Sequence, residues 1–343
     1  MKDNKLNALF EKNNVIQEVN QKNTERYIIP TGYIALDYGI LGIGGFPTGH
    51  MVEIFGKEGC GKTTMAMHIA LNVQKMGGMV FLADTERWDL DRATKMGIDL
   101  SKEHLVRIQG ATLEEIFSNI YTAVEAYKQF KITTPTVVIF DSIALTPSKF
   151  ELEATIKGSS APVASTARIL TSVLKTLEIM LEDLPILIVI INQYRMNLSN
   201  LNKPSYLSSW KTMYQTTGGE ALKFACHARI ELIPKKTFEQ GDRVYGHFIQ
   251  ATAIKNKIAP PNIKREYLQF YNGKVGNWHT VITEGTKLGI IQQKGAWYSY
   301  KEHKFQGALG ILKLDKKVYK ELEKDVSMAL KNEITEIYET KLL

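Results

Sequence analysis

The chain has 343 residues, of which 44% are hydrophobic and 23% are charged, and its formal net charge is +7 at pH 7. This length and composition predict a globular protein with one large core or two domains, and the positive charge favours a polyanionic partner. Two isolated cysteines exclude a disulfide framework or a cysteine zinc site, and the longest apolar run, Leu184 to Ile191, is too short for a membrane helix.

The first segment, residues 1–27, is polar with widely spaced apolar positions. This spacing predicts one weak amphipathic helix, and a solvated tail is the alternative. Such a helix is too thin to form a core alone, so we expect it to pack on another surface.

Residues 28–275 alternate short apolar runs with longer helical patterns. The runs that predict strands are Met51–Phe55, Met79–Ala83, Thr136–Phe140 and Pro185–Ile191, and the patterns that predict helices are Lys62–Met76, residues 113–127 and Val163–Leu181. Continuously apolar strands separated by helices predict an α/β fold, in which helices flank a mostly parallel sheet. Ligands bind such sheets at the carboxyl ends of the strands.

The segment from Gly56 to Thr63 reads Gly-Lys-Glu-Gly-Cys-Gly-Lys-Thr, which is the P-loop pattern between a predicted strand and a predicted helix. Its glycines let backbone N–H groups converge on phosphate, and the following helix adds free N–H groups and a favourable dipole. Lys62 is expected to reach the β- and γ-phosphates, and Thr63 to hold Mg²⁺. The sequence therefore predicts a nucleoside triphosphate site.

Polar residues follow the other predicted strands. Asp141 ends the apolar strand that begins at Thr136, which is the Walker B arrangement, and we expect it to support Mg²⁺. Glu86 follows the second strand and is the first candidate to activate water; Asp84 is the alternative, and a solvated acidic turn stays open. Gln193 follows the fourth strand and either senses the γ-phosphate or caps the strand.

The stretch from Asn192 to Gly219 is polar and contains several aromatic residues, which predicts a long functional loop. After residue 275 glycines recur, and a helix rich in lysine and glutamate closes the chain. We therefore predict a small α+β domain over residues 276–343.

Several stretches together resemble the bacterial RecA recombinases over about residues 28–330. They are Pro30–Gly32, Ala35–Asp37, Gly56–Thr64, Asp84–Glu86, Asp141–Pro147, Ile191–Met196, Thr216–Phe224, Lys255–Ala259 and Gly295–Tyr300. The last three are more specific than the P-loop, which many ATPases share.

The resemblance implies a DNA-dependent ATPase that forms helical filaments on single-stranded DNA and pairs it with homologous double-stranded DNA. It also implies that residues 1–27 are an oligomerisation segment that docks on the next protomer. It implies ATP and Mg²⁺ at subunit interfaces, bound by Gly56, Glu58, Gly59, Cys60, Gly61, Lys62, Thr63, Thr64, Asp89, Arg92 and Asp141. The implied catalytic residues are Glu86, Lys62 and Gln193, with Lys255 and Lys257 acting from the adjacent subunit.

Two DNA-binding loops are implied at about Glu151–Ser165 and Tyr194–Thr217. The implied DNA-binding residues are Pro162, Arg168, Lys175, Arg195, Trp210, Gly218 and Gly219. Basic side chains there would bind phosphate. Trp210 is expected either to stack on a base or to pack within the loop.

The chain departs from the family pattern at several positions. Arg92 stands where a tyrosine usually stacks on adenine, although a guanidinium plane can stack as well. Cys60 replaces a common serine at a helix N-terminus, where a thiol can be reactive. The second loop is longer than usual, and the tail lacks a strongly acidic run.

The resemblance also implies a cytoplasmic, nucleoid-associated protein with roles in DNA repair and the SOS response to DNA damage. Host or phage origin, loader and mediator proteins, and a repressor partner stay open. The competing interpretations are a DNA motor or repair ATPase of another class with the same fold, and a non-catalytic regulatory filament.

Overall fold

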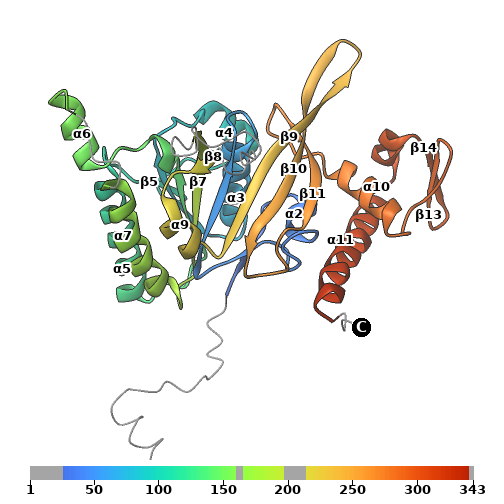
Figure 1. Ribbon diagram of the computed structural model, residues 1–343. Coiled ribbons are helices and arrows are strands. Elements are labelled where there is room, and N and C mark those ends of the chain that lie inside the picture. The colour runs from blue at the N-terminus through green and yellow to red at the C-terminus, as the bar shows by residue number, and fades with distance from the viewer. Residues whose placement is uncertain (1–25, 160–164, 197–213, 340–343) are drawn as a thin grey trace, which may run out of the picture.

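Figure 1 shows the computed structural model of the chain, which describes residues 26–159, 165–196 and 214–339. The helix predicted near the N-terminus lies outside these ranges.

A nine-stranded, mostly parallel sheet forms the centre of the fold, in the order β11-β10-β9-β3-β7-β6-β4-β5, with the short β8 paired to β7. The pairs among β3, β4, β5, β6 and β7 and the β3–β9 pair are parallel, whereas β8, β10 and β11 join antiparallel. Its strands are β3 (His50–Gly56), β4 (Met79–Asp84), β5 (Leu105–Arg107), β6 (Thr136–Asp141), β7 (Ile186–Met196), β8 (Tyr214–Thr216), β9 (Ala228–Gln240), β10 (Arg243–Asn256) and β11 (Lys264–Phe270). β1 (Ile28–Ile29) and β2 (Phe46–Pro47) pair antiparallel in a separate small sheet. The predicted α/β class is confirmed.

Successive residues of a strand point to opposite sides of the sheet, so its apolar strands present two apolar faces. Helices cover both of these faces. The helices are α2 (Ile34–Asp37), α3 (Lys62–Lys75), α4 (Leu90–Met96), α5 (Leu113–Phe130), α6 (Lys149–Ile156), α7 (Ser165–Leu181) and α9 (Gly219–Ala225), with a 3₁₀ turn η1 (Ile143–Leu145). Val52, Ile54 and Val189 share a core cluster with α3, whereas Ile188 and Ile190 share another with α5 and α7. In Figure 1, α5 and α7 accordingly lie together on one side of the sheet.

The helix α5 forms where the apolar spacing at residues 113–127 predicts it. Ile116, Ile120 and Val124 are buried on one face, and each such side chain contributes about 1.5–3 kcal/mol when it leaves water. The Thr112 hydroxyl caps the first turn by accepting the backbone N–H of Glu115 over 3.4 Å.

The predicted loop after Ile191 begins later than expected. β7 continues to Met196, and β8 pairs with it antiparallel, so the two strands form the base of this segment. The prediction was wrong at this boundary because the residues are polar, although their side chains reach buried partners. Asn192 is fully buried, and its Nδ2 donates to Glu53 Oε1 over 2.8 Å.

The first of the two expected DNA loops also begins as a helix, since α6 extends to Ile156. Its start is a capping box: Ser148 Oγ accepts the backbone N–H of Glu151 over 3.2 Å, and Glu151 Oε2 accepts that of Ser148 over 2.8 Å. A serine followed three residues later by a glutamate, here Ser148 and Glu151, is a sequence signal for a helix start. The prediction of a loop from Glu151 overlooked this signal.

A small α+β unit with its own antiparallel sheet lies at the right of Figure 1 and confirms the predicted type of C-terminal fold. Its elements are α10 (Asn277–Lys287), β12 (Gln292–Lys294), β13 (Trp297–Tyr300), β14 (His303–Gln306), the 3₁₀ helix η4 (Ala308–Lys313) and α11 (Lys316–Glu339). Val281, Leu322 and Val326 lie in its core, which also includes Phe248 and Leu268 of the central sheet. The boundary at residues 275 and 276 stays a prediction.

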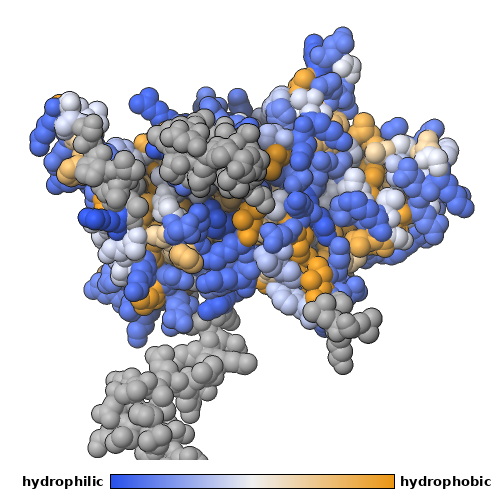
Figure 2. All heavy atoms as spheres, viewed as in Figure 1, coloured by the Kyte–Doolittle hydropathy of each residue, from blue (hydrophilic) through white to orange (hydrophobic). Residues whose placement is uncertain are grey.

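Hydrophilic residues dominate the face shown in Figure 2, and hydrophobic ones form small groups. The β9–β10 ribbon extends well beyond the sheet and is largely hydrophilic at its tip. In the described parts of the chain, no helix has both the length and the apolar character that a membrane crossing requires.

Candidate nucleotide-binding site and DNA interface

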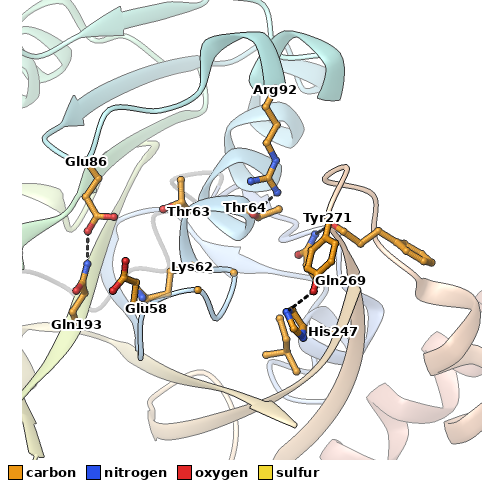
Figure 3. Close-up of a pocket in the computed structure, with 14 residues that line it drawn as sticks. Glu58, Lys62, Thr63, Thr64, Glu86, Arg92, Gln193, His247, Gln269 and Tyr271 are labelled. Atoms are coloured by element: carbon orange, nitrogen blue, oxygen red, sulfur yellow. Dashed lines mark hydrogen bonds between the residues drawn. The ribbon is translucent and has the colours of Figure 1, made fainter. Parts of the chain in front are cut away.

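A pocket opens at the carboxyl ends of β3 and β7, the edge where parallel sheets bind their ligands (Figure 3). The predicted residues that line it are Glu58, Gly59, Gly61, Lys62, Thr63, Thr64, Glu86, Arg92 and Gln193. The structure therefore brings together residues from four separate sequence segments.

The P-loop has the backbone that its glycines predict. Gly59 and Gly61 have φ angles of 72° and 85°, which favour glycine. A Cβ at Gly56 would lie 2.4 Å from the Leu232 carbonyl oxygen, so this position also requires glycine. Because the N-cap residue of α3 is Gly61, which has no side chain to cap the helix, its first N–H groups are left for phosphate.

Lys62 lies over the loop and is only 5% exposed. Its Nζ donates to the carbonyl oxygens of Lys57 and Gly56, over 2.7 and 3.3 Å. The Cys60 sulfur lies 3.8 Å from the same Nζ. Cys60 is fully buried, and burial raises the pKa of its thiol. This environment opposes the reactivity that its position at a helix N-terminus suggests.

Asp141 and Thr63 fit a magnesium site. Burial raises the pKa of the Asp141 carboxyl to about 6, and hydrogen bonds from Trp88 and Thr63 partly oppose this shift. Asp141 Oδ2 accepts the Trp88 indole N–H over 2.9 Å, whereas Oδ1 is buried with no partner among the described residues. A buried carboxylate oxygen without a donor is an oxygen ligand suited to Mg²⁺ or to its waters.

Glu86 and Gln193 face each other at one end of the pocket (Figure 3). Gln193 Nε2 donates to Glu86 Oε1 over 2.5 Å, and the Ser142 hydroxyl donates to the same oxygen over 2.7 Å. The backbone N–H of Glu86 donates to the Asp141 carbonyl over 3.2 Å, so the water-activating candidate is tied to the predicted magnesium ligand. Gln193 thus bonds to a pocket residue from within β7, which continues to Met196.

Asp84, the alternative to Glu86, does not line this pocket. Its Oδ2 accepts the Trp88 backbone N–H over 2.9 Å and forms an ion pair with Arg107 over 3.1 Å. Its side chain is 1% exposed.

Asp89 caps α4, and its Oδ1 accepts the backbone N–H of Arg92 over 2.9 Å. It does not line the main pocket but lies in a neighbouring hollow, together with His68, Met96 and Arg92. Arg92 lines both hollows.

Lys255 and Lys257 do not line the pocket of their own chain. Lys255 is opposite Arg229 on β9, which pairs with Glu53 on β3, before the P-loop begins at Gly56. Its Nζ donates to the Lys223 and Phe224 carbonyl oxygens, both over 2.7 Å. Partial burial and the nearby Lys257 charge lower the pKa of Lys255.

A stacked histidine pair lies beside these lysines. The rings of His50 and His227 are 3.6 Å apart between centroids, and the His227 carbonyl accepts the Lys257 backbone N–H over 2.9 Å. Burial and the neighbouring cations lower the pKa of both imidazoles to about 4. The pair is therefore neutral near pH 7, so it adds no charge beside the lysines.

The candidate DNA-binding residues lie on separate elements. Arg168 and Lys175 are exposed on α7, and Arg195 is exposed on β7, where its Nη2 donates to the Ala144 carbonyl. Gly218 and Gly219 begin α9 with φ angles of 100° and 59°. Pro162 and Trp210 lie outside the described residues.

A buried polar network joins the base of the second candidate loop to β3 and β7. Asn192 donates to Glu53 and also to the Thr217 carbonyl, both over 2.8 Å. Arg229 forms an ion pair with the other Glu53 oxygen and donates to the Thr216 hydroxyl over 3.2 Å. Asn192 directly precedes Gln193, the residue that contacts Glu86.

Sequence reasoning missed the part of the pocket that comes from the antiparallel strands. His247, Ile249, Gln269, Phe270 and Tyr271 complete its lining. They follow the P-loop by well over a hundred residues, and no spacing relates them to it. Trp88, which contacts Asp141, was also missed; its only signal is that it lies close to Glu86 in the chain.

A P-loop at the end of a central parallel strand, with a Walker B carboxylate near it, defines an α/β protein of the P-loop nucleotide-binding class. A family model described as the RecA N-terminal domain matches residues 3–275, and one described as the RecA C-terminal domain matches residues 279–331. The chain belongs to the RecA family.

The chain is similar to curated proteins named Protein RecA. It is 35% identical to that of Chloroflexus aurantiacus over 271 residues, which cover 79% of this chain and 72% of the relative. It is 33% identical to that of Legionella pneumophila over 316 residues, or 92% and 84% of the two chains. Family membership supports nucleotide and DNA binding and a recombinase role.

Proposed function

We propose that this protein is a DNA-dependent ATPase that forms helical filaments on single-stranded DNA and catalyses homologous pairing and strand exchange during DNA repair. The observation that carries this proposal is the link between the pocket and the second candidate loop. Gln193 contacts Glu86 in the pocket, and the strand that holds Gln193 continues into the β7–β8 base of that loop. In this proposal, a change of bound nucleotide at Gln193 and contact with DNA at the loop both act on β7.

In this proposal the residues at and beside the pocket have separate roles. Thr63 and Asp141 would hold Mg²⁺, which supplies neutralisation of phosphate charge when it is bound. Lys62 binds the β- and γ-phosphates, and Gln193 senses the γ-phosphate. Glu86 accepts the proton of the attacking water, which is supported by its place in the pocket and by the absence of Asp84 from the described lining.

Lys255 and Lys257 are proposed to act on the nucleotide of the adjacent subunit. Their absence from the lining of their own pocket supports this role, because a head-to-tail contact can bring two different surfaces of identical chains together. Two cations at the γ-phosphate would stabilise the charge that develops there during transfer.

A mixture of two inactive variants tests the role in trans. Lys62→Ala and Lys255→Ala chains are each expected to have little ATP turnover alone, and an equal mixture to recover activity. Random mixing completes about a quarter of the interfaces, because the intact P-loop and the intact lysine then come from different chains. The measurement is DNA-stimulated phosphate release against mixing ratio; a mixture no more active than the separate variants would contradict action in trans.

The proposed function is tested by joint-molecule formation between a single-stranded oligonucleotide and homologous supercoiled duplex, with ATP and Mg²⁺. We expect joints with homologous duplex and none with a heterologous duplex of equal length. DNA-stimulated ATP hydrolysis without joints would instead favour a motor of the same fold.

The remaining expectations stay proposals. We propose a cytoplasmic location with association to the nucleoid, a response to DNA damage, and a division of the chain at residues 27 and 275. Loader, mediator and repressor partners are part of the same proposal.

A further inference from the structure

Arg92 lies at the opposite end of the pocket from Glu86 and Gln193 (Figure 3). Its guanidinium points at the first turn of α3, and its Nη2 donates to Thr64 Oγ1 over 2.8 Å. Its Nε is buried and has no hydrogen-bond partner among the described residues. Buried donors of this kind are almost always paired, so a cationic donor is left for a ligand.

The orientation of the phosphate chain follows from the two ends of the pocket. Glu86 and Gln193 mark the end at which the terminal phosphate would be cleaved. The free N–H groups at the start of α3 hold the phosphates, and Thr64 belongs to that first turn. The nucleoside must therefore leave toward Arg92, which places the guanidinium beside the phosphate nearest the nucleoside.

The part of the pocket wall that Tyr271 and His247 form offers little that could distinguish one base from another. The Tyr271 hydroxyl and His247 Nε2 are bonded to each other over 2.9 Å, so these two polar groups are already paired. The Tyr271 side chain is about half exposed, and its ring can stack on any base, since every base has a π-face.

We propose that Arg92 binds the α-phosphate of the nucleotide rather than stacking on its base, and that the site consequently accepts nucleoside triphosphates with weak base selectivity. A guanidinium forms charge-assisted hydrogen bonds to phosphate, and these do not depend on the base. The proposal rests on the proposed ATPase function and identifies the α-phosphate as the part of the substrate that Arg92 contacts.

The test measures the binding of MgADP, MgGDP and MgCDP by calorimetry to the full chain and to variants. Diphosphates contain the α-phosphate and avoid turnover. We expect the wild type to bind all three within about threefold of one another. Arg92→Met should weaken all three by the same factor, about tenfold, because one charge-assisted contact is lost. Arg92→Lys should recover part of the loss, and Lys102→Met, an exposed charge outside the pocket, should bind like wild type.

The alternatives have distinct outcomes. A loss confined to the purine nucleotides would show that Arg92 stacks on the base and would overturn the proposal. So would no loss at all, or an equal loss in Lys102→Met. A wild type that binds none of the three would overturn the proposed function itself. Thermal unfolding of each variant shows whether a loss reflects the contact or the fold.

Discussion

Replacing Lys62 with alanine is expected to abolish ATP turnover, with a fall of at least about a thousandfold. Its Nζ is the cation held over the P-loop by the Lys57 and Gly56 carbonyl oxygens, and it is almost fully buried. No described side chain in the P-loop could replace this charge, because Lys57, the other lysine of the loop, does not line the pocket. The measurement is phosphate release with saturating single-stranded DNA.

Lys57→Ala is the matched control. It removes a lysine side chain from the same loop but keeps the backbone carbonyl that accepts from Lys62. We expect it to retain most of the activity. Full activity in Lys62→Ala, with Lys57→Ala inactive, would mean that the phosphate-binding lysine has been assigned to the wrong position.

Replacing Glu86 with glutamine is expected to preserve nucleotide binding and to slow hydrolysis by about 10²–10⁴-fold, the usual contribution of a general base. The amide keeps the size of the side chain but cannot take a proton from water. Filaments on single-stranded DNA should therefore persist with ATP, since the bound triphosphate is not consumed. Single-turnover hydrolysis and filament lifetime, measured by electron microscopy, give the two readouts.

Asp84→Asn separates the two acidic candidates. Asp84 is buried and paired with Arg107, so we expect the change to affect stability more than hydrolysis. Normal hydrolysis by Glu86→Gln, with a folded but inactive Asp84→Asn, would transfer the water-activating role to Asp84. Thermal unfolding is measured alongside, because the buried Asp84 side chain accepts hydrogen bonds from Trp88 and Arg107 that the amide satisfies less well.

The local parts of the site were predictable because they are contiguous in the chain. The P-loop, the Walker B strand and the acid after β4 each combine an apolar strand with a polar end, a pattern visible in one short segment. The continuation of β7 beyond Ile191 and the helix α6 were missed for a different reason. Polar residues were read as loop, although Asn192 and Ser148 satisfy their polar groups within regular structure.

The sequence by itself determined the fold class, the nucleotide site and the family resemblance, because strand periodicity and P-loop chemistry depend on neighbouring residues. Only the tertiary structure decided which acid lines the pocket, where Arg92 directs its guanidinium, and that Lys255 lies away from its own P-loop. These facts depend on the order and register of strands distant in the chain. His247 and Tyr271 reach the pocket because β10 and β11 join the sheet beside β9, and pairing between distant strands leaves no periodic signal in the sequence.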